Sequence, residues 1–150
     1  QGDQSVFTRD ISIGGNAYTE AVQKELGLSF DAAEQLKRGV PVDGATVEDA
    51  EPVLRAVTEN VVLEVQKTLE FFKTTSAVER IDQVVLSGGV SRVEGLRELL
   101  EERLHAPVEY FDPFRTVKWE AAKLGNVDPA LVASTAAVAV GLALRQGGDR

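Results

Sequence analysis

The chain carries a glycine pair at which a ligand could approach the backbone closely. Residues 84–86 are a continuous apolar run, and Ser87-Gly88-Gly89 follows them directly. Because glycine has no Cβ atom, a flat ligand can lie against such a loop, and the N–H groups of a following helix favour polar or anionic atoms. A strand-to-helix turn that merely requires glycine would look the same. The spacing fits neither a Walker A loop nor a dinucleotide fingerprint.

Glu34 and Lys37 form the second candidate group. They are three positions apart in a predicted helix and therefore share one face. The carboxylate can accept hydrogen bonds from sugar hydroxyls, and the long lysine side chain can reach further. A solvated ion pair within one helix, worth a few tenths of a kcal/mol, has the same spacing, so the residues alone leave both interpretations open.

The composition excludes several classes of function. Acidic residues outnumber basic ones 24 to 16, and the net charge of -8 repels a phosphate backbone, so we expect no nucleic-acid partner. With no cysteine and one histidine, the chain cannot form disulfides and lacks the usual zinc ligands. Glu98, Glu101 and Glu102 are interpreted as the outer face of a helix. We assign no catalytic and no metal-binding residue.

Helices and turns dominate the first half of the chain. Residues 5–13 are rich in β-branched and aromatic side chains and end at Gly14-Gly15, which predicts a strand and a tight turn. Asn16 and Ser29 are predicted to cap two short helices, and Gly27 to end the first of them. An apolar stripe then predicts a helix of about 25 residues with one face on a core and Pro52 in its first turn. The stripe consists of Leu54, Val57, Val61, Val65, Leu69 and Phe72.

The second half of the chain contains a strand, a helix and a strand. Residues 83–86 predict a strand covered on both faces, leucines at 96, 99, 100 and 104 predict a helix that the glycine pair opens, and residues 107–111 predict a short strand. Together they predict a βαβ unit with a parallel crossover.

The tail ends in an uncharged segment. Asp128-Pro129 is a helix cap followed by proline at the first helical position, and residues 129–144 carry no charge. This segment is too short and too weakly apolar to span a membrane, so we predict one buried helix over 128–145 that packs closely through small residues. Such a helix needs a partner surface. Residues 146–150 are predicted to be frayed.

Several of these motifs resemble those of one protein family. Residues 84–89, with Ser91-Arg92 and Gly95-Leu96, are similar to the adenosine motif of the actin-like ATPases. Residues 7–11 with Gly14-Gly15 and Thr19, followed by residues 33–37, resemble in particular the PilM family of type IV pilus assembly proteins, which are relatives of FtsA and MreB. The match runs from about Val6 to Leu144, with the elements in the same order.

The resemblance implies that the candidate residues bind ATP. The ribose would be reached by Glu34 and Lys37, the adenine would lie along Gly88, Gly89 and Arg92, and the phosphates would lie near Gly14 and Gly15. A β-turn would explain the two glycines at positions 14 and 15 equally well. Magnesium and the phosphates would be held mainly by residues outside this chain, because both aspartate-glycine hairpins of such ATPases lie upstream of it.

The predicted fold class is α/β, as an actin-like (RNase H-like) half-molecule with a mixed sheet, flanking helices and a helical lobe. Residues 5–125 would form the adenosine-side subdomains, and the helix at 128–145 would pack against the missing N-terminal half. The chain opens with neither methionine nor a leader, so we expect a piece of a longer protein.

The expected function is nucleotide binding within a pilus assembly machine. The intact protein would bind ATP in the cytoplasm, peripheral to the bacterial inner membrane and without inserting into it. By the resemblance, its partner is the cytoplasmic tail of PilN, contacted mostly through the missing half. Any ATPase activity would belong to the intact protein and not to this chain alone.

Three other functions stay open from the sequence. A cytoskeletal filament protein like FtsA or MreB would share the same cleft, and an actin-fold kinase would need a catalytic aspartate upstream. A structural interaction module with a degenerate site would not turn over nucleotide. Two aspartate-glycine hairpins in the upstream sequence would favour an ATP cleft, and their loss would favour the structural module.

Overall fold

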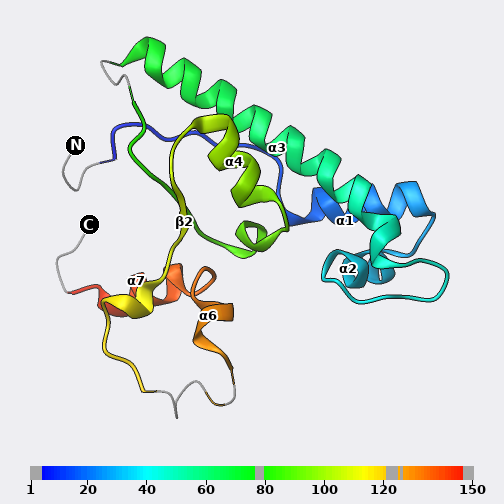
Figure 1. Cartoon of the computed structure of the whole chain (residues 1–150). Coiled ribbons are helices and arrows are strands. Elements are labelled where there is room, and N and C mark those ends of the chain that lie inside the picture. Colours follow the sequence, from blue (N-terminus) through cyan, green and yellow to red (C-terminus); the bar gives the residue numbers. More distant parts are fainter. Residues whose placement is uncertain (1–4, 77–79, 121–124, 126, 147–150) are drawn as a thin grey trace. The chain divides into compact units, whose positions relative to one another are not determined.

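The computed structural model describes residues 5–76, 80–120, 125 and 127–146, and the chain divides into two compact units. The first unit comprises Gln1–Ile81 with Glu102–Leu104, and the second comprises Asp82–Glu101 with His105–Arg150. Figure 1 colours the chain from blue at the N-terminus to red at the C-terminus. The first unit is helical, and the second combines a small sheet with short helices.

Among its described residues, the first unit is built mainly from the helices α1 (Gly15–Leu26), α2 (Phe30–Lys37) and α3 (Val47–Thr75). Helix α1 packs against α2 and α3, and α2 also packs against α3 (Figure 1). The buried side chains between them form one cluster, which consists of Val22, Ala33, Leu36, Ala45 and Ala50. The predicted helical lobe is therefore present in this unit.

Local capping chemistry sets the ends of α1 and α2. The Ser29 side chain accepts a hydrogen bond from the Ala32 N–H at 3.2 Å, as predicted for the start of α2. Gly27 ends α1 in the left-handed conformation, with φ of 65°, which glycine adopts without strain. The predicted cap Asn16 was wrong: Gly14 is the N-cap, and Asn16 lies in the first turn because α1 begins at Gly15.

Helix α3 begins earlier than its apolar stripe indicated. Thr46 and Asp49 form a capping box, in which Asp49 Oδ2 accepts from the Thr46 N–H at 2.8 Å. The helix therefore starts at Val47, and Pro52 lies in its second turn and not in the first as predicted. The six residues of the predicted stripe are half-buried, whereas the fully buried positions on α3 are Ala50, Thr58 and Val62.

The predicted strand at residues 5–13 is absent. This segment has no regular secondary structure and is mostly exposed. A strand needs a neighbour for its backbone hydrogen bonds, and no strand among the described residues pairs with this segment. Phe7 instead places its ring 6.3 Å from that of Phe71 and 5.1 Å from that of Phe72, measured between centroids.

The second unit contains the predicted strand-helix-strand order. Strands β1 (Val84–Leu86) and β2 (Val108–Tyr110) are parallel, with Val85 opposite Glu109, and α4 (Leu96–Leu104) connects them. The parallel pairing is confirmed, and Leu96 and Leu100 are the buried positions of α4. Within the described residues the sheet has two strands, so the predicted mixed sheet is not seen there.

Two details of this unit differ from the prediction. Val85 is 52% exposed, so β1 is not covered on both faces, because a two-stranded sheet leaves one face open here. The glycine pair does not open α4 directly. It leads into a 3-10 turn, η1 (Gly89–Arg92), and α4 begins at Leu96 after Gly95.

The tail contains two helices where one was predicted. After the 3-10 turn η2 (Pro113–Arg115), helix α6 (Pro129–Val132) begins at the predicted Asp128 cap, and α7 (Ala137–Leu144) follows a break. At the break, the Ser134 carbonyl accepts from the Gly88 N–H at 2.7 Å and from Ser87 Oγ at 3.0 Å. An uninterrupted helix would use that carbonyl for the N–H four residues later, so these long-range bonds favour the break.

None of the residues of α7 is buried within this chain, and the predicted packing of this helix on the missing N-terminal half stays a prediction. In the described part of the chain, no helix combines the length and apolar character that crossing a membrane requires. Of the tail predicted to be frayed, residues 147–150 lie outside the described residues.

Candidate functional site

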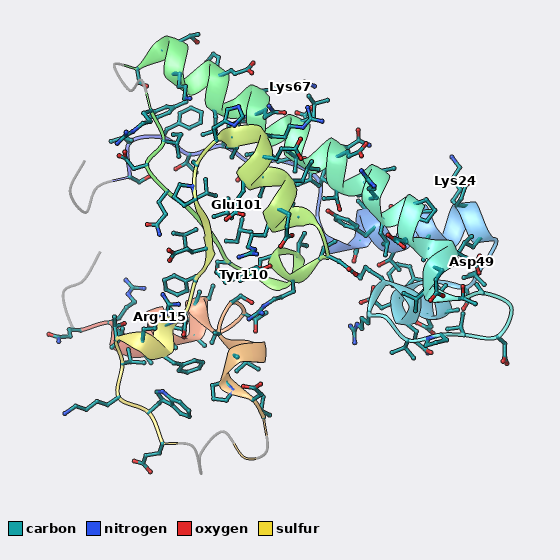
Figure 2. All side chains as sticks on the ribbon, viewed as in Figure 1. Lys24, Asp49, Lys67, Glu101, Tyr110 and Arg115 are labelled. Atoms are coloured by element: carbon teal, nitrogen blue, oxygen red, sulfur yellow. The ribbon has the colours of Figure 1, made fainter. Side chains whose placement is uncertain are left out.

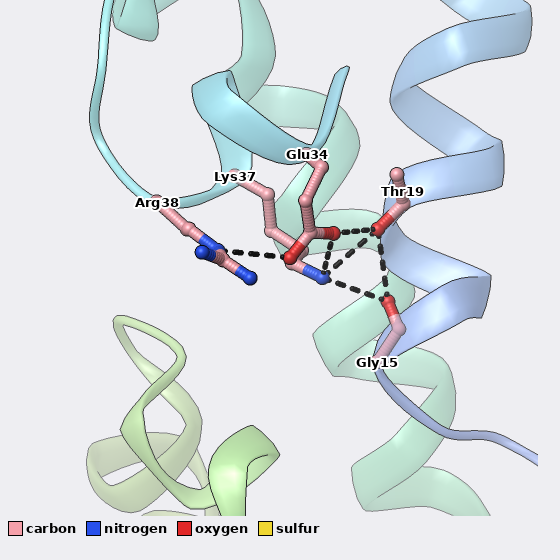
Figure 3. A network of polar contacts seen from close by, with 5 residues as sticks. All are labelled: Gly15, Thr19, Glu34, Lys37 and Arg38. Atoms are coloured by element: carbon pink, nitrogen blue, oxygen red, sulfur yellow. Dashed lines mark hydrogen bonds and ion pairs between the residues drawn. The ribbon is translucent and has the colours of Figure 1, made fainter. Parts of the chain in front are cut away.

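Helix α2 presents Glu34 and Lys37 on the face that meets α1, as Figure 3 shows. The Lys37 Nζ lies 2.5 Å from Glu34 Oε2, and the two side chains are 15% and 25% exposed, respectively. The prediction that they share one helix face is confirmed. Because both are mostly withdrawn from solvent, the pair is not the freely solvated one that the spacing also allowed.

Thr19 of α1 forms hydrogen bonds with both residues of this pair. Its hydroxyl donates to Glu34 Oε2 at 2.6 Å and accepts from Lys37 Nζ at 2.9 Å (Figure 3). Lys37 also donates to the Gly15 carbonyl at 3.3 Å. Thr19 is fully buried, and sequence reasoning missed it as a site residue. The available signal was its position next to Tyr18 on the inward face of α1, where a threonine needs a polar partner.

Glu34 is held in its ionised form. The hydrogen bond from Lys37, and after it the bond from Thr19, lowers the pKa of the Glu34 carboxyl from its usual 4.5 to about 2. The other carboxylate oxygen, Oε1, accepts from Arg38 Nε at 2.9 Å, and the Arg38 side chain is 71% exposed. The carboxylate therefore has one oxygen tied to the interior and one at the solvent edge.

This lowered pKa predicts a pH-dependent contribution to stability. A carboxyl whose pKa is depressed on folding stabilises the fold above its unfolded value near 4.5, and that contribution is lost as the pH falls toward about 2. We expect Glu34→Gln to remove about 1–2 kcal/mol of unfolding free energy near neutral pH, allowing for partial solvent screening, and the difference from wild type to shrink below pH 4.5 and to vanish only below the folded pKa of about 2. Urea unfolding of both proteins across this range measures it. A difference that is constant with pH would contradict the predicted titration.

Gly14 and Gly15 lie beside this network at the start of α1. Gly14 is the N-cap in an extended conformation, no side chain caps the helix, and the first turn holds no acidic residue. The N–H groups of an uncapped helix start lack intrahelical acceptors and carry the positive end of the helix dipole. An anionic group is therefore the natural complement of this end of α1.

The second unit gathers the remaining candidates around the glycine loop. Gly88 has φ of 89°, its N–H is taken by the Ser134 carbonyl, and Ser91 Oγ donates to its carbonyl at 2.6 Å. A Cβ atom at Gly89 would meet nothing within 4 Å, so the backbone there is open to an approaching group. In this loop, the N–H of Gly88 is therefore already hydrogen-bonded, whereas the backbone at Gly89 is accessible.

Arg92 is held by contacts within the second unit. Its Nε donates to Ser134 Oγ at 3.2 Å, its Nη2 donates to the Ala130 carbonyl, and its guanidinium lies 4.8 Å from the centre of the Tyr110 ring on β2, which is labelled in Figure 2. Sequence reasoning missed Ser134, because nothing local links it to a loop more than forty residues earlier.

The structure thus forms two groups from the predicted residues. One contains Gly15, Glu34 and Lys37 with Gly14 adjacent, and the other contains Gly88, Gly89 and Arg92. Glu101 from the acidic cluster of α4 instead accepts a hydrogen bond from the Val108 N–H at 3.1 Å. Across the described ranges, no three acidic or histidine side chains gather into a possible metal site.

Comparisons with known proteins agree on one family. The model for the type IV pilus assembly protein PilM matches residues 1–147. A solved structure of a PilM-PilN type IV pilus biogenesis complex is similar at 29% identity with a TM-score of 0.78, and the match covers 96% of this chain and 40% of that one. The chain therefore spans less than half the length of this relative. Because the family model covers nearly every residue, the chain belongs to the PilM family of type IV pilus assembly proteins.

Proposed function

We propose that this chain is the adenosine-side half of a longer, actin-like PilM protein that binds ATP and takes part in type IV pilus assembly. The observation that carries the nucleotide proposal is Glu34, an ionised carboxylate fixed on one side by Lys37 and Thr19 and reaching solvent on the other. Such a group is suited to accept hydrogen bonds from the hydroxyls of a ribose.

We propose a separate contribution from each unit. In the first unit, Glu34 would accept from the ribose and the uncapped start of α1 at Gly14 and Gly15 would face phosphate. In the second unit, the open backbone at Gly89 would leave room for the flat base. The Arg92 guanidinium would lie along the adenine, as the family resemblance implies. Magnesium would neutralise phosphate charge when bound, with ligands mainly from outside this chain, as the family resemblance implies.

The proposed partners follow from the similar complex. That relative was solved with PilN, so we propose the cytoplasmic tail of PilN as the partner of the intact protein, mostly through the half that this chain does not contain. The proposed location is the cytoplasmic side of the inner membrane. The exposed apolar helix α7 would pack on the N-terminal half of the same protein.

Calorimetric titration with ATP tests the nucleotide proposal. We expect the intact protein to bind ATP, and this chain alone to bind it weakly and to show no measurable ATPase, because half of the phosphate contacts would be missing while the entropy of association is still lost. Low-micromolar binding by the chain alone would mean that the whole site lies here. Glu34→Gln in the intact protein should weaken binding about tenfold.

A structural role without nucleotide is the second candidate. The Gly88 N–H donates to the Ser134 carbonyl, and the Arg92 side chain donates to Ser134 Oγ and to the Ala130 carbonyl, so both groups have protein partners without a ligand. An intact protein that binds PilN but shows no heat of binding with ATP would favour this alternative.

A further inference from the structure

The Ser134 carbonyl, at the break between α6 and α7, is bonded to two donors of the glycine loop. It accepts from the Gly88 N–H at 2.7 Å and from Ser87 Oγ at 3.0 Å, which fills both of its lone pairs. In a continuous helix over 129–144, the same carbonyl would accept from the Val138 N–H. The Ser134 carbonyl can therefore bond either to the loop or within the helix.

The backbone on both sides of the break is already helical. Ala133 has φ of -50° and ψ of -51°, and Ala136 has φ of -78° and ψ of -8°, both in the right-handed helical region. The Ala136 N–H donates to the Val132 carbonyl at 2.8 Å, which is the spacing of an α-helical bond across the break. A continuous helix therefore requires only a local change of the backbone around residues 134 and 135.

The start of α7 favours such a continuous helix. Its N-cap, Ala136, makes no side-chain capping bond, and the first turn carries no acidic residue. The N–H groups of a first turn lack intrahelical acceptors, and a continuous helix would supply the carbonyls of residues 133–135. Because no residue of α7 is buried within this chain, packing here does not fix the direction of the helix. Among the described contacts, the loop bonds to Ser134 compete directly with the continuous helix.

We propose that the Ser134 carbonyl is a hydrogen-bond switch in the second unit. When the loop holds it, α6 and α7 are separate helices; when the loop releases it, residues 129–144 form one helix and α7 changes direction. The two states exchange bonds of the same kind, so the loss of one loop bond is enough to shift their populations. The switch rests on the proposed function only in naming the N-terminal half as the surface on which α7 docks.

Amide hydrogen exchange, followed by NMR on this chain, tests the switch. Ser87→Ala removes one of the two loop bonds, so we expect the Gly88 amide to exchange faster and the Val138 amide to exchange more slowly, each by about two- to tenfold. General destabilisation would speed both. The control is Thr116→Val, which removes a hydroxyl bond to the Pro113 carbonyl in the same unit and should change neither amide. Unchanged or faster exchange at Val138 in Ser87→Ala would overturn the switch.

A proline at position 137 blocks the continuous helix. In a helix interior it would remove the N–H that bonds to the Ala133 carbonyl and clash with the preceding turn, whereas the first position of a separate helix accepts proline. In Ser87→Ala with Ala137→Pro, the exchange of the Val138 amide should therefore return to its wild-type rate. Slow exchange that persists in this double variant would show that the protection does not come from a continuous helix, and would count against the proposal.

Joining to the separately expressed N-terminal half tests what the switch controls. A helix whose direction the loop already fixes loses less freedom on docking, so Ser87→Ala should weaken joining by about two- to tenfold in calorimetry, and Thr116→Val should not. Equal joining by wild type and Ser87→Ala overturns the link between the loop and docking. Wild-type chain that does not join overturns the proposed role of α7 instead, while the opposite changes at Gly88 and Val138 still decide the switch.

Discussion

Replacing Leu36 with alanine should lower the unfolding free energy of the first unit by about 2–5 kcal/mol. Leu36 is fully buried in α2 and belongs to the cluster that joins α1, α2 and the start of α3. Alanine would leave a cavity between helices that the neighbouring side chains fill only in part. The same turn of α2 carries Glu34 and Lys37, so the network to Thr19 should loosen as well.

Urea unfolding followed by far-ultraviolet circular dichroism measures this loss. Leu63→Ala is the matched control, because Leu63 lies on α3 and is 46% exposed, and its truncation should change stability by about 0.5 kcal/mol or less. If the two variants unfold alike, Leu36 does not hold the three helices together as its burial indicates.

Local signals in the sequence predicted the helical elements well. Ser29, Gly27 and Asp128 act through residues within one helical turn, so their types alone were enough to place the ends of α1, α2 and α6. The parallel pair β1 and β2 followed from the order of strand, helix and strand. Even Pro52 was misplaced by one turn only, because the capping box at Thr46 lies outside the apolar stripe.

The wrong predictions depend on contacts between distant segments. Residues 5–13 have the composition of a strand, but a strand forms only where another strand offers hydrogen bonds, and composition does not report that neighbour. The tail has the composition of one helix, yet the Ser134 carbonyl bonds to the Ser87-Gly88 loop and the helix breaks there. Each outcome is decided by a partner far away in the chain.

In the candidate site, too, the features set by neighbouring residues were predicted and those set by distant residues were not. The common face of Glu34 and Lys37 follows from their spacing of three, whereas the bond from Thr19 to Glu34 joins residues fifteen positions apart. The depth of the pKa shift at Glu34 depends on that bond as well as on Lys37. The sequence could therefore identify the charged pair but not the buried hydroxyl that fixes it.

Gly141→Leu should weaken the joining of this chain to the proposed N-terminal half while leaving the chain itself folded. Within this chain, Val138 and Leu142 of α7 are 73% and 60% exposed, and a Cβ atom at Gly141 would meet nothing within 4 Å. Leucine therefore fits the isolated chain and even favours the helix, by up to about 1 kcal/mol. In the intact protein, the added volume would obstruct a helix that approaches its partner closely through small residues. Overpacking of this kind costs about 1–3 kcal/mol, which is on the order of 5- to 150-fold in affinity.

The two effects are measured separately on the same variants. Thermal unfolding of the chain reports its own stability, and calorimetry or pull-down with the separately expressed N-terminal half reports joining. Gly141→Ala is the control. It reduces the conformational entropy of the unfolded chain in the same way but adds little volume, so we expect it to bind the N-terminal half nearly as well as wild type does. If Gly141→Leu destabilises the chain as much as it weakens joining, then Gly141 packs inside this chain. If it joins normally, then α7 makes no close contact through this position, and the exposed apolar residues at 138 and 142 must be covered by a different surface.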